Sequence, residues 1–393
     1  MKKISLSLVA IATLSFYASA NAQSLNEALK NGKVSGEVAA TYENRNFDRK
    51  VNGDNIYYQD TAYSIGSFAL KYETSVWNNL SLTSKFRAYG TIYEEDKNSQ
   101  TYYGTGDATE RFYEKNGSTR SVDIEELFLA YNLENISVKT GRQAISSDWM
   151  NKTHDAVKID ANWGDTSIEA IWSLRDGRIY SRDYRPMEKM NGNDGVYKLG
   201  LTQKFNENIS ATTYGLIMPD MKDIYGARTN LTFEDTKVRL HYAISQEDAV
   251  LRSDSSIIDV MVSSSIAGFS PYIGYVKVDK DAAFPGYSNS DSNDSGEIIV
   301  PFEEGDYLYS KDAQTIYLGI AKSFGDLSTS VLYGTTRYDA GNEMQKNHET
   351  SLWLGYPIMK DLKAKLGYTI VDEDENSAAS DYDQVNFTLA YSF

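Results

Sequence analysis

Apolar and polar side chains alternate with a period of two in short windows along almost the whole chain. The final stretch, DQVNFTLAYSF, places an apolar residue at every second position from Val385 to Phe393, with polar or small residues between them. This period predicts β-strands whose two faces meet different surroundings. Helical periodicity is confined to residues 24–33, which can form one or two helical turns. The predicted strands, about eighteen in all, cover residues 34–45, 63–75, 80–93, 122–133, 136–142, 155–163, 166–174, 195–205, 208–218, 224–233, 236–246, 256–266, 268–278, 312–322, 326–338, 348–357, 361–373 and 381–393.

The links between these strands alternate in length. Every second link is a turn of a few residues, such as WGD around Gly164 and FGD around Gly325. The alternate links are mostly longer and cover residues 47–62, 94–121, 143–154, 175–194, 219–223, 247–255, 279–311, 339–347 and 374–380. Such alternation is typical of an up-and-down barrel with one rim facing the periplasm and the other facing outward. The sequence therefore predicts an all-β fold: a transmembrane antiparallel up-and-down β-barrel of about 18 strands, with short periplasmic turns and long extracellular loops, formed by residues 34–393.

The two faces of each predicted strand indicate two solvents. In residues 361–373, for example, Leu366 and Tyr368 share one face, whereas Lys363 and Lys365 share the other. A sheet can cross a bilayer only if it closes on itself, because every backbone group must be paired internally. A barrel of about eighteen strands is too wide for side chains to fill. The polar face therefore surrounds water, and the chain is predicted to form a pore in the bacterial outer membrane.

The amino-terminal residues predict export. Residues 1–22 combine two lysines, an apolar stretch and the small-residue pattern Ala20-Asn21-Ala22, which is typical of a cleaved secretory signal peptide. Residues 23–33 are then expected to form a short periplasmic segment ahead of the barrel. The chain contains no cysteine, which excludes disulfides and thiolate metal sites.

Charge and aromatic content narrow the class of partner. The formal net charge of −16 argues against nucleic acid. The 30 tyrosines suit a membrane-interface belt, where an aromatic ring is apolar along its body and wet at its tip. The expected partners are outer-membrane lipid and lipopolysaccharide, together with small hydrophilic solutes and ions.

Several features together resemble the OprD-type outer-membrane porins, especially those of epsilonproteobacteria. These are the segment SLNEALKNGKVSGEVAATYENR at residues 24–45, the TGRQ at Thr140–Gln143, the strand count and the terminal aromatic residue. The resemblance implies an eighteen-stranded barrel, passive uptake of small solutes, a constriction made by inward-folded loops, and a ladder of basic side chains on one wall. It also implies that the barrel-assembly machinery recognises Phe393, and it allows either a monomer or a homotrimer.

Strand parity assigns charged residues to the pore lining. The basic ladder is assigned Arg45, Lys71, Lys85, Arg87, Lys139, Lys363 and Lys365, and the opposite wall is assigned Asp160, Glu169 and Asp259. The intervening strands also present Lys198, Arg228, Lys237 and Arg239 to the lumen. Arg142 of TGRQ has the opposite parity, so it lies at the rim or a bulge turns it inward. Separated walls of opposite sign would orient polar solutes; an ordinary solvated lumen without selectivity is the alternative.

The long stretch 279–311 makes the outer mouth acidic. It carries eight acidic residues against Lys280 and Lys311, which predicts a preference for cations at the mouth. Within it, Asp291, Asn293, Ser295 and Gly296 match only the first half of a calcium loop, because the twelfth position is Phe302 where that loop requires glutamate. No dedicated metal site and no cofactor are therefore expected, although a loop cation of low affinity is compatible with this composition.

No catalytic motif is evident. The chain contains no HExxH, P-loop or GxSxG pattern. Its three histidines, His154, His241 and His348, are expected to be polar residues of the rim or lumen. The leading hypothesis is thus a porin for passive diffusion of small hydrophilic solutes and ions, and not an enzyme.

Two other classes of function are compatible with a barrel. An outer-membrane enzyme of the lipase or protease type would need only about ten to twelve strands and a catalytic centre at the rim, with His154 and Asp155 as its first candidates. A structural or adhesive surface barrel would instead use its long loops as the interface.

Overall fold

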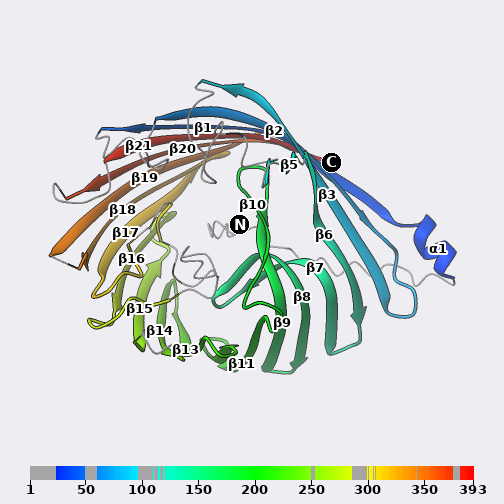
Figure 1. Cartoon of the computed structure of the whole chain (residues 1–393), viewed down its shortest axis with the longest axis horizontal. Helices are drawn as coiled ribbons and strands as arrows, with labels where there is room; N and C mark the ends of the chain where they lie inside the picture. Colours follow the sequence, from blue (N-terminus) through cyan, green and yellow to red (C-terminus); the bar gives the residue numbers. More distant parts are fainter. Residues whose placement is uncertain are drawn as a thin grey trace.

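The computed structural model describes residues 24–48, 60–95, 109, 114–115, 118–119, 121–248, 253–285, 299, 301–303, 305, 307–341, 343–374 and 381–393. Within them, eighteen antiparallel strands form a closed barrel, because β21 pairs with β1 (Figure 1). A nineteenth strand, β10, pairs with the end of β9 and stands in the middle of the barrel (Figure 1). The predicted transmembrane-type all-β barrel is confirmed.

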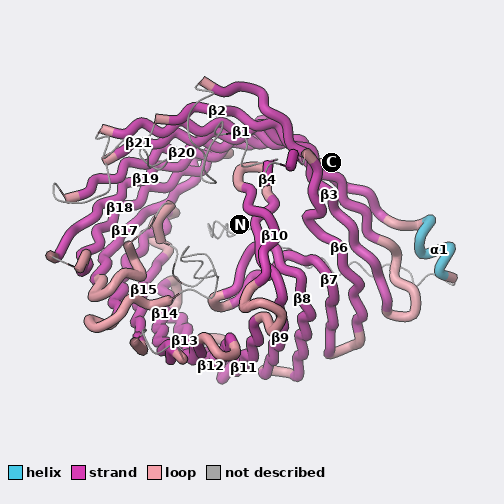
Figure 2. The backbone as a smooth tube through the Cα atoms, in the orientation of Figure 1, coloured by secondary structure: helices cyan, strands magenta, loops and turns pink. Residues whose placement is uncertain are grey.

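Nearly all of the described chain is strand (Figure 2). The barrel strands are β1 (Lys33–Phe47), β2 (Thr61–Glu73), β3 (Leu80–Glu94), β6 (Val122–Asn132), β7 (Ile136–Ser147), β8 (Met150–Trp163), β9 (Thr166–Ile179), β11 (Val196–Asn206), β12 (Ile209–Met218), β13 (Lys222–Phe233), β14 (Thr236–Glu247), β15 (Ser255–Ser264), β16 (Phe269–Val278), β17 (Gln314–Phe324), β18 (Leu327–Asp339), β19 (Met344–Met359), β20 (Leu362–Glu373) and β21 (Tyr382–Ser392). The remaining elements are α1 (Leu25–Lys30), the short hairpin β4 (Glu114–Lys115) and β5 (Ser118–Thr119), and β10 (Tyr184–Lys189). The helical turns expected within residues 24–33 are present as α1.

One rim consists of tight turns, as predicted. Backbones with positive φ close several of them, for example Gly164 (58°), Glu234 (51°) and Gly325 (60°). The opposite rim differs from the prediction at residues 143–154, which were expected to form a long loop. There β7 continues to Ser147 and β8 begins at Met150, which leaves a turn of two residues.

The outer face of the barrel is apolar. On β17, Ile316 and Leu318 are about half exposed, whereas Tyr317 between them is 2% exposed and faces inward. Exposed aromatic side chains gather where strands meet the tight turns: Trp163, Phe205, Phe233, Phe324 and Phe393. This pattern matches an outer surface that contacts hydrocarbon and ends in an interfacial girdle. No helix in the described part of the chain is long and apolar enough to cross a membrane.

The terminal residue completes the closure of the barrel. The amide of Gly36 donates to the carbonyl oxygen of Phe393 at 2.8 Å, and the Phe393 amide donates to the Gly36 carbonyl oxygen at 3.1 Å. The Phe393 ring stacks with the ring of Phe68, with 6.4 Å between centroids. Strand pairing therefore holds the last residue in place, and its ring remains on the outer face.

Replacing Gly36 by valine is expected to destabilise this seam by about 1–3 kcal/mol, the usual cost of overpacking. A Cβ at Gly36 would lie 2.3 Å from Cζ of Phe393 and 2.6 Å from the carbonyl oxygen of Ala69, so ring and strand must shift. The temperature at which the folded band is lost on a heat-modifiability gel measures the effect. Gly90→Val is the control, because a Cβ there meets nothing within 4 Å; equal losses in both variants would contradict the close-packed seam.

Candidate functional site: the lumen and its constriction

Arg87 lies on the inner face of β3, in a buried cluster of charged side chains. It is 3% exposed, and its Nε lies 2.9 Å from Oε2 of Glu125. Its second nitrogen lies 3.0 Å from Oε1 of Glu37, and Nζ of Lys85 lies 2.6 Å from Glu125 Oε1. Arg87 therefore ties β1, β3 and β6 together.

A β-bulge supplies the central carboxylate of this cluster. The pairing of β3 with β6 shifts by one residue between Lys85 and Phe86, which leaves Glu125 as the extra residue. Both Glu125 and its neighbour Glu126 can therefore reach the lumen cations: Glu126 Oε2 lies 3.6 Å from Nζ of Lys71. Simple parity would place only one of the two glutamates inside.

The acidic residues predicted for the opposite wall also have basic neighbours. Lys158 Nζ lies 2.7 Å from Oδ1 of Asp160 and 3.1 Å from Oε2 of Glu169. Lys198 Nζ lies 3.0 Å from the other Glu169 oxygen. Lys139, which pairs with Lys158 across β7 and β8, has its ammonium 5.5 Å from the centre of the Phe128 ring.

Acidic and basic side chains also pair with each other farther around the barrel. Arg239 Nε lies 2.8 Å from Oδ2 of the fully buried Asp259. Arg228 lies 3.0 Å from Oδ1 of Asp148, which belongs to the turn between β7 and β8. In this part of the lumen the charges are paired locally and do not form two separated walls of opposite sign.

Two basic side chains near the closure of the barrel, Arg45 on β1 and Lys365 on β20, have aromatic neighbours. Arg45 Cζ lies 4.9 Å from the centre of the Tyr382 ring, and Lys365 Nζ lies 3.9 Å from the centre of the Trp353 ring. Lys363, two residues before Lys365 on β20, is exposed. Among the described residues no carboxylate forms an ion pair with Lys139, Lys363 or Lys365, so these three stay candidates for the predicted basic ladder.

The TGRQ segment marks the point where β7 leaves the barrel wall. Pairing of β6 with β7 ends at Leu127 and Arg142, whereas pairing of β7 with β8 continues to Ser147. Gly141 has a φ of 121°, and a Cβ there would lie 2.3 Å from the Leu127 carbonyl oxygen, so glycine is required. The next residue, Arg142, fills the gap that opens between β6 and β7.

Arg142 bridges the wall and the strands that diverge from it. Its Nε donates to Oδ1 of Asp155 at 2.7 Å, and another nitrogen donates to the Ile124 carbonyl oxygen at 3.0 Å. The same nitrogen lies 3.4 Å from Asp123, which also accepts from the hydroxyl of Tyr184 on β10 at 2.8 Å. Arg142 is thus inside the molecule despite its parity.

The turn between β7 and β8 is seated against the inner wall. Trp149 is 1% exposed, and its indole Nε1 donates to the Tyr214 hydroxyl at 2.6 Å. That hydroxyl lies 2.5 Å from Nε2 of His241. Met150 and Phe284 belong to the same buried apolar cluster. The lumen therefore contains a hydrophobic core of its own, which the alternating pattern of the sequence does not predict.

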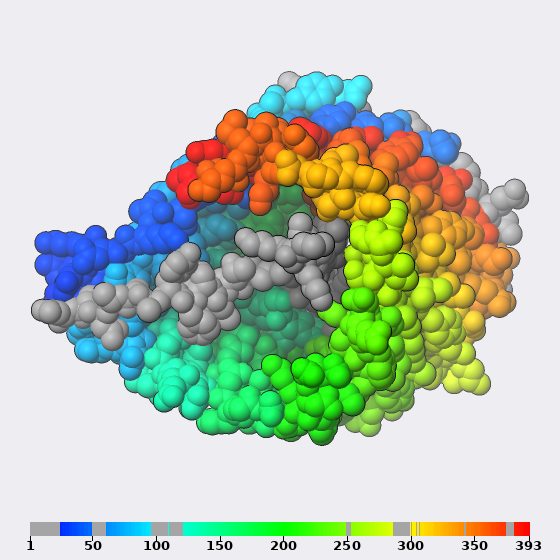
Figure 3. All heavy atoms as spheres, turned by 180° about the vertical axis from the view of Figure 1, so that it is seen from behind, coloured from blue at the N-terminus to red at the C-terminus, as the bar shows by residue number. Residues whose placement is uncertain are grey.

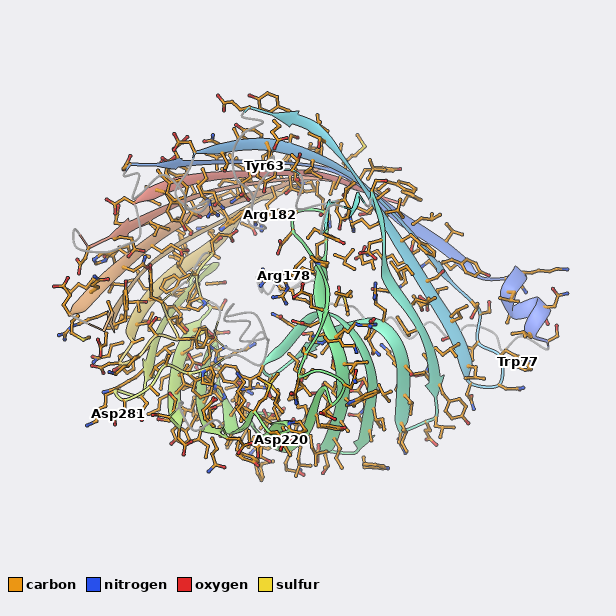
Figure 4. All side chains as sticks on the ribbon, viewed as in Figure 1. Tyr63, Trp77, Arg178, Arg182, Asp220 and Asp281 are labelled. Carbon is orange, nitrogen blue, oxygen red and sulfur yellow. The ribbon has the colours of Figure 1, made fainter. Side chains whose placement is uncertain are left out.

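A hairpin formed by the end of β9 and by β10 crosses the lumen. Its tip, residues 180–183, meets the far wall, where the Tyr89 hydroxyl donates to the Tyr180 carbonyl oxygen at 3.1 Å. Tyr184 packs there against Tyr63 and Tyr89. Figure 4 shows Arg178 on this hairpin, in the central opening, and Arg182 near its tip. We call residues 175–189 the crossing hairpin.

An ion pair joins the tip of the crossing hairpin to a second inward segment. Arg182 pairs with Glu303, and the Arg182 guanidinium carbon lies 5.4 Å from the centre of the Trp353 ring. The Glu303 amide donates to Oε1 of Glu349 at 2.7 Å, and the Gly305 amide donates to Oε2 at 3.2 Å. The buried Glu349 carboxylate on β19 therefore anchors the segment that receives Arg182. Viewed from the other end, the wall surrounds a hollow (Figure 3).

The histidines do not change the functional picture. His154 is fully buried, with Nδ1 2.9 Å from Oγ of Ser173 and Nε2 2.7 Å from the Asn151 carbonyl oxygen. It lies in the diverging part of β8 and not at an open rim. His348 faces outward beside Tyr333, with 3.2 Å between Nδ1 and the hydroxyl. That the chain is not an enzyme stays a prediction.

The partial calcium motif falls outside the described residues at Asp291, Asn293 and Ser295. Its twelfth position, Phe302, is buried and packs against Tyr317. Within the described ranges, no group of three or more histidine, aspartate or glutamate side chains could hold a metal ion.

Comparisons with known proteins agree with this architecture. Residues 1–165 match the family model of the Campylobacter major outer membrane protein. The structure of Acinetobacter baumannii OccAB4 is similar, with a TM-score of 0.74 and 12% identity over 92% of this chain and 98% of that chain. The structure of Pseudomonas aeruginosa OccK3 (OpdO) has a TM-score of 0.73 and 16% identity, over 94% of this chain and 98% of that chain. The structure of OpdQ from the same organism has a TM-score of 0.70 and 15% identity, over 93% of this chain and 99% of that chain. No curated protein matches the sequence.

The fold is that of the OprD-type porins. At 12–16% identity the structural likeness concerns the fold, and the family match concerns the first 165 residues. Together they support the resemblance stated from the sequence and the location in the bacterial outer membrane.

Proposed function

We propose that the protein is a passive porin for small hydrophilic solutes and ions. The observation that carries this proposal is the division of charge between the two faces of one closed sheet. The inner face holds the ion-pair clusters around Arg87 and Lys158, whereas the outer face is covered by long apolar side chains. Charged groups are costly away from water, so a lumen lined with them favours a wet channel.

We further propose that the channel prefers cations. From the sequence, the stretch 279–311 is predicted to give the mouth an excess of acidic residues. Three of the lumen cations predicted for the basic ladder, Lys71, Lys85 and Arg87, have a carboxylate oxygen within 3.6 Å, which weakens their attraction for anions. Lys363 and Lys365 oppose this preference, so a modest selectivity is expected.

Reconstitution of the purified protein into a planar bilayer tests both parts. With a tenfold KCl gradient, we expect discrete conductance steps and a reversal potential of the sign that reports K⁺ as the more permeant ion. A bilayer that stays sealed would contradict the porin, whereas clear steps with a reversal potential of opposite sign would contradict only the cation preference.

A further inference from the structure

Three basic side chains form one row on the lipid-facing surface near the long-loop rim. Lys277 of β16 pairs with Gln314 of β17, Gln314 with Arg337 of β18, and Arg337 with Lys346 of β19. The three cations are exposed, and they share the face that carries Ile316 on β17. We call Lys277, Arg337 and Lys346 the outer basic row.

The outer basic row is unpaired in an otherwise acidic protein. The ion pairs and ring contacts of the described residues include none with Lys277, Arg337 or Lys346, whereas nearby Lys311 pairs with Asp339 at 2.9 Å. Arg337 and Lys346 are direct cross-strand partners. Like charges in that position repel each other and destabilise a sheet. A bound anion between them would remove this cost.

The outer basic row extends over four strands, β16 to β19, and ends on both sides. On β15 its next position is the apolar Ile258, which pairs with Lys277. Beyond Lys346 lies Asp374, whose carboxylate accepts the Lys346 backbone amide at 2.8 Å. The positive charge is therefore a local patch and not a belt around the barrel.

The height of the row corresponds to the outer membrane interface. From Phe324 in the lower aromatic girdle to Gln314 in the row, β17 spans ten residue steps, or about 33 Å of strand. At a strand tilt of about 40° this is a rise of roughly 25 Å, the height of the apolar band of such barrels. The row thus lies at the level of lipid headgroups in the outer leaflet.

The surface below the row is suited to acyl chains. Leu318, Val331 and Tyr333 are between 43% and 51% exposed there. His348, next to the row, lies within 3.2 Å of the Tyr333 hydroxyl and adds a polar group at the boundary. A ligand for this patch therefore needs anionic groups at the row and apolar chains beneath it.

We propose that the outer basic row binds the phosphate groups of lipopolysaccharide, whose acyl chains lie on β17 and β18. Arginine binds phosphate in a bidentate manner and lysine binds it as a point charge, so the row can hold two phosphates through charge-assisted hydrogen bonds. This site does not depend on whether the lumen conducts solutes.

Titration of the purified barrel in detergent with deep-rough lipopolysaccharide tests the site, with bound lipid counted by native mass spectrometry. A chelator is present so that divalent ions cannot bridge phosphates to carboxylates. The triple variant Lys277→Gln, Arg337→Gln, Lys346→Gln is expected to bind about 100-fold more weakly, since each cation near a lipid surface contributes roughly fivefold. Lys322→Gln is the matched control: it removes a lipid-facing cation at the opposite end of β17, beside Phe269, and binding should not change.

Two further binding measurements use the wild-type protein alone. They therefore test the proposal even if the triple variant fails to fold. Lipopolysaccharide treated with phosphatase should lose binding to a similar extent, and millimolar inorganic phosphate should not compete. Equal binding by the triple variant, or equal binding of the dephosphorylated lipid, would overturn the proposal. Displacement by inorganic phosphate would assign the row to free phosphate, and equally tight binding of phosphatidylglycerol would reduce it to a general anionic surface; either result also overturns it.

Discussion

Replacing Arg182 by alanine is expected to raise single-channel conductance roughly twofold, since conductance follows the narrowest cross-section of a pore. Arg182 joins the crossing hairpin to Glu303 and lies over Trp353, so the variant removes two of the contacts that hold the tip and leaves the hydrogen bond from Tyr89 to Tyr180. The hairpin would then move within the lumen and leave a wider passage. Planar-bilayer recordings should show larger steps with more current noise than the wild type.

Matched variants separate anchoring from charge. Glu303→Gln removes the same ion pair from the other side and should also raise conductance. Arg178→Ala removes a cation of the same hairpin whose carboxylate partner, Asp183 at 3.1 Å, lies within the hairpin itself. It should change selectivity more than step size. If Arg182→Ala and Glu303→Gln both conduct like the wild type, the crossing hairpin does not set the constriction.

Glu125→Leu is expected to destabilise the barrel by about 3–5 kcal/mol, the usual cost of removing one partner of a buried ion pair. Glu125 is 6% exposed and is the shared partner of Arg87 and Lys85. Without it, Glu37 is the one carboxylate among the described residues that still pairs with the buried Arg87 guanidinium. Denaturant unfolding in detergent, followed by tryptophan fluorescence, measures the loss.

The control for this prediction is the neighbouring carboxylate. Glu126→Leu removes a longer contact, 3.6 Å to a partly exposed Lys71, and should cost about 0–1 kcal/mol. The double variant Arg87→Met, Glu125→Leu should recover much of the stability, because no buried charge is then left alone. Equal losses for Glu125→Leu and Glu126→Leu would show that burial of Arg87 does not govern this cluster.

The strands could be predicted because lipid and water impose a strict period on the wall. On β20 and β21 every second side chain faces hydrocarbon, so the predicted ranges 361–373 and 381–393 lie within two residues of the observed strands. The same parity placed Lys363 and Asp259 on the inner face. Parity follows from the pleat alone, and the pleat is regular wherever the wall is regular.

The constriction could not be predicted from that period. In residues 143–154 the strands leave the wall and meet protein on both faces, so polar side chains such as Gln143 and His154 are buried there. Because the alternation of apolar and polar side chains disappears there, the segment was wrongly predicted to be a loop. The apolar pair Trp149–Met150 in a supposedly extracellular loop was the available signal for an inward segment.

Ion pairing was equally hidden, because it depends on register. The Glu125 bulge brings a second carboxylate to Lys85 and Arg87, and no pattern in the sequence of β6 announces it. Arg182 and Glu303 are far apart in the chain and meet only because two separate segments fold inward. The crossing hairpin, its ion pair and the Glu349 anchor were therefore missed.

The most direct test of the two-solvent barrel uses the absence of cysteine in the chain. Single cysteines are placed on β20 at Lys363 and Lys365, and at Leu366 and Tyr368, and the protein in lipid vesicles is exposed to a charged, membrane-impermeant thiol reagent. We expect rapid labelling and altered conductance at 363 and 365, and no labelling at 366 and 368. Equal labelling at all four positions, or labelling of 366 and 368 alone, would contradict a barrel with hydrocarbon outside and water within.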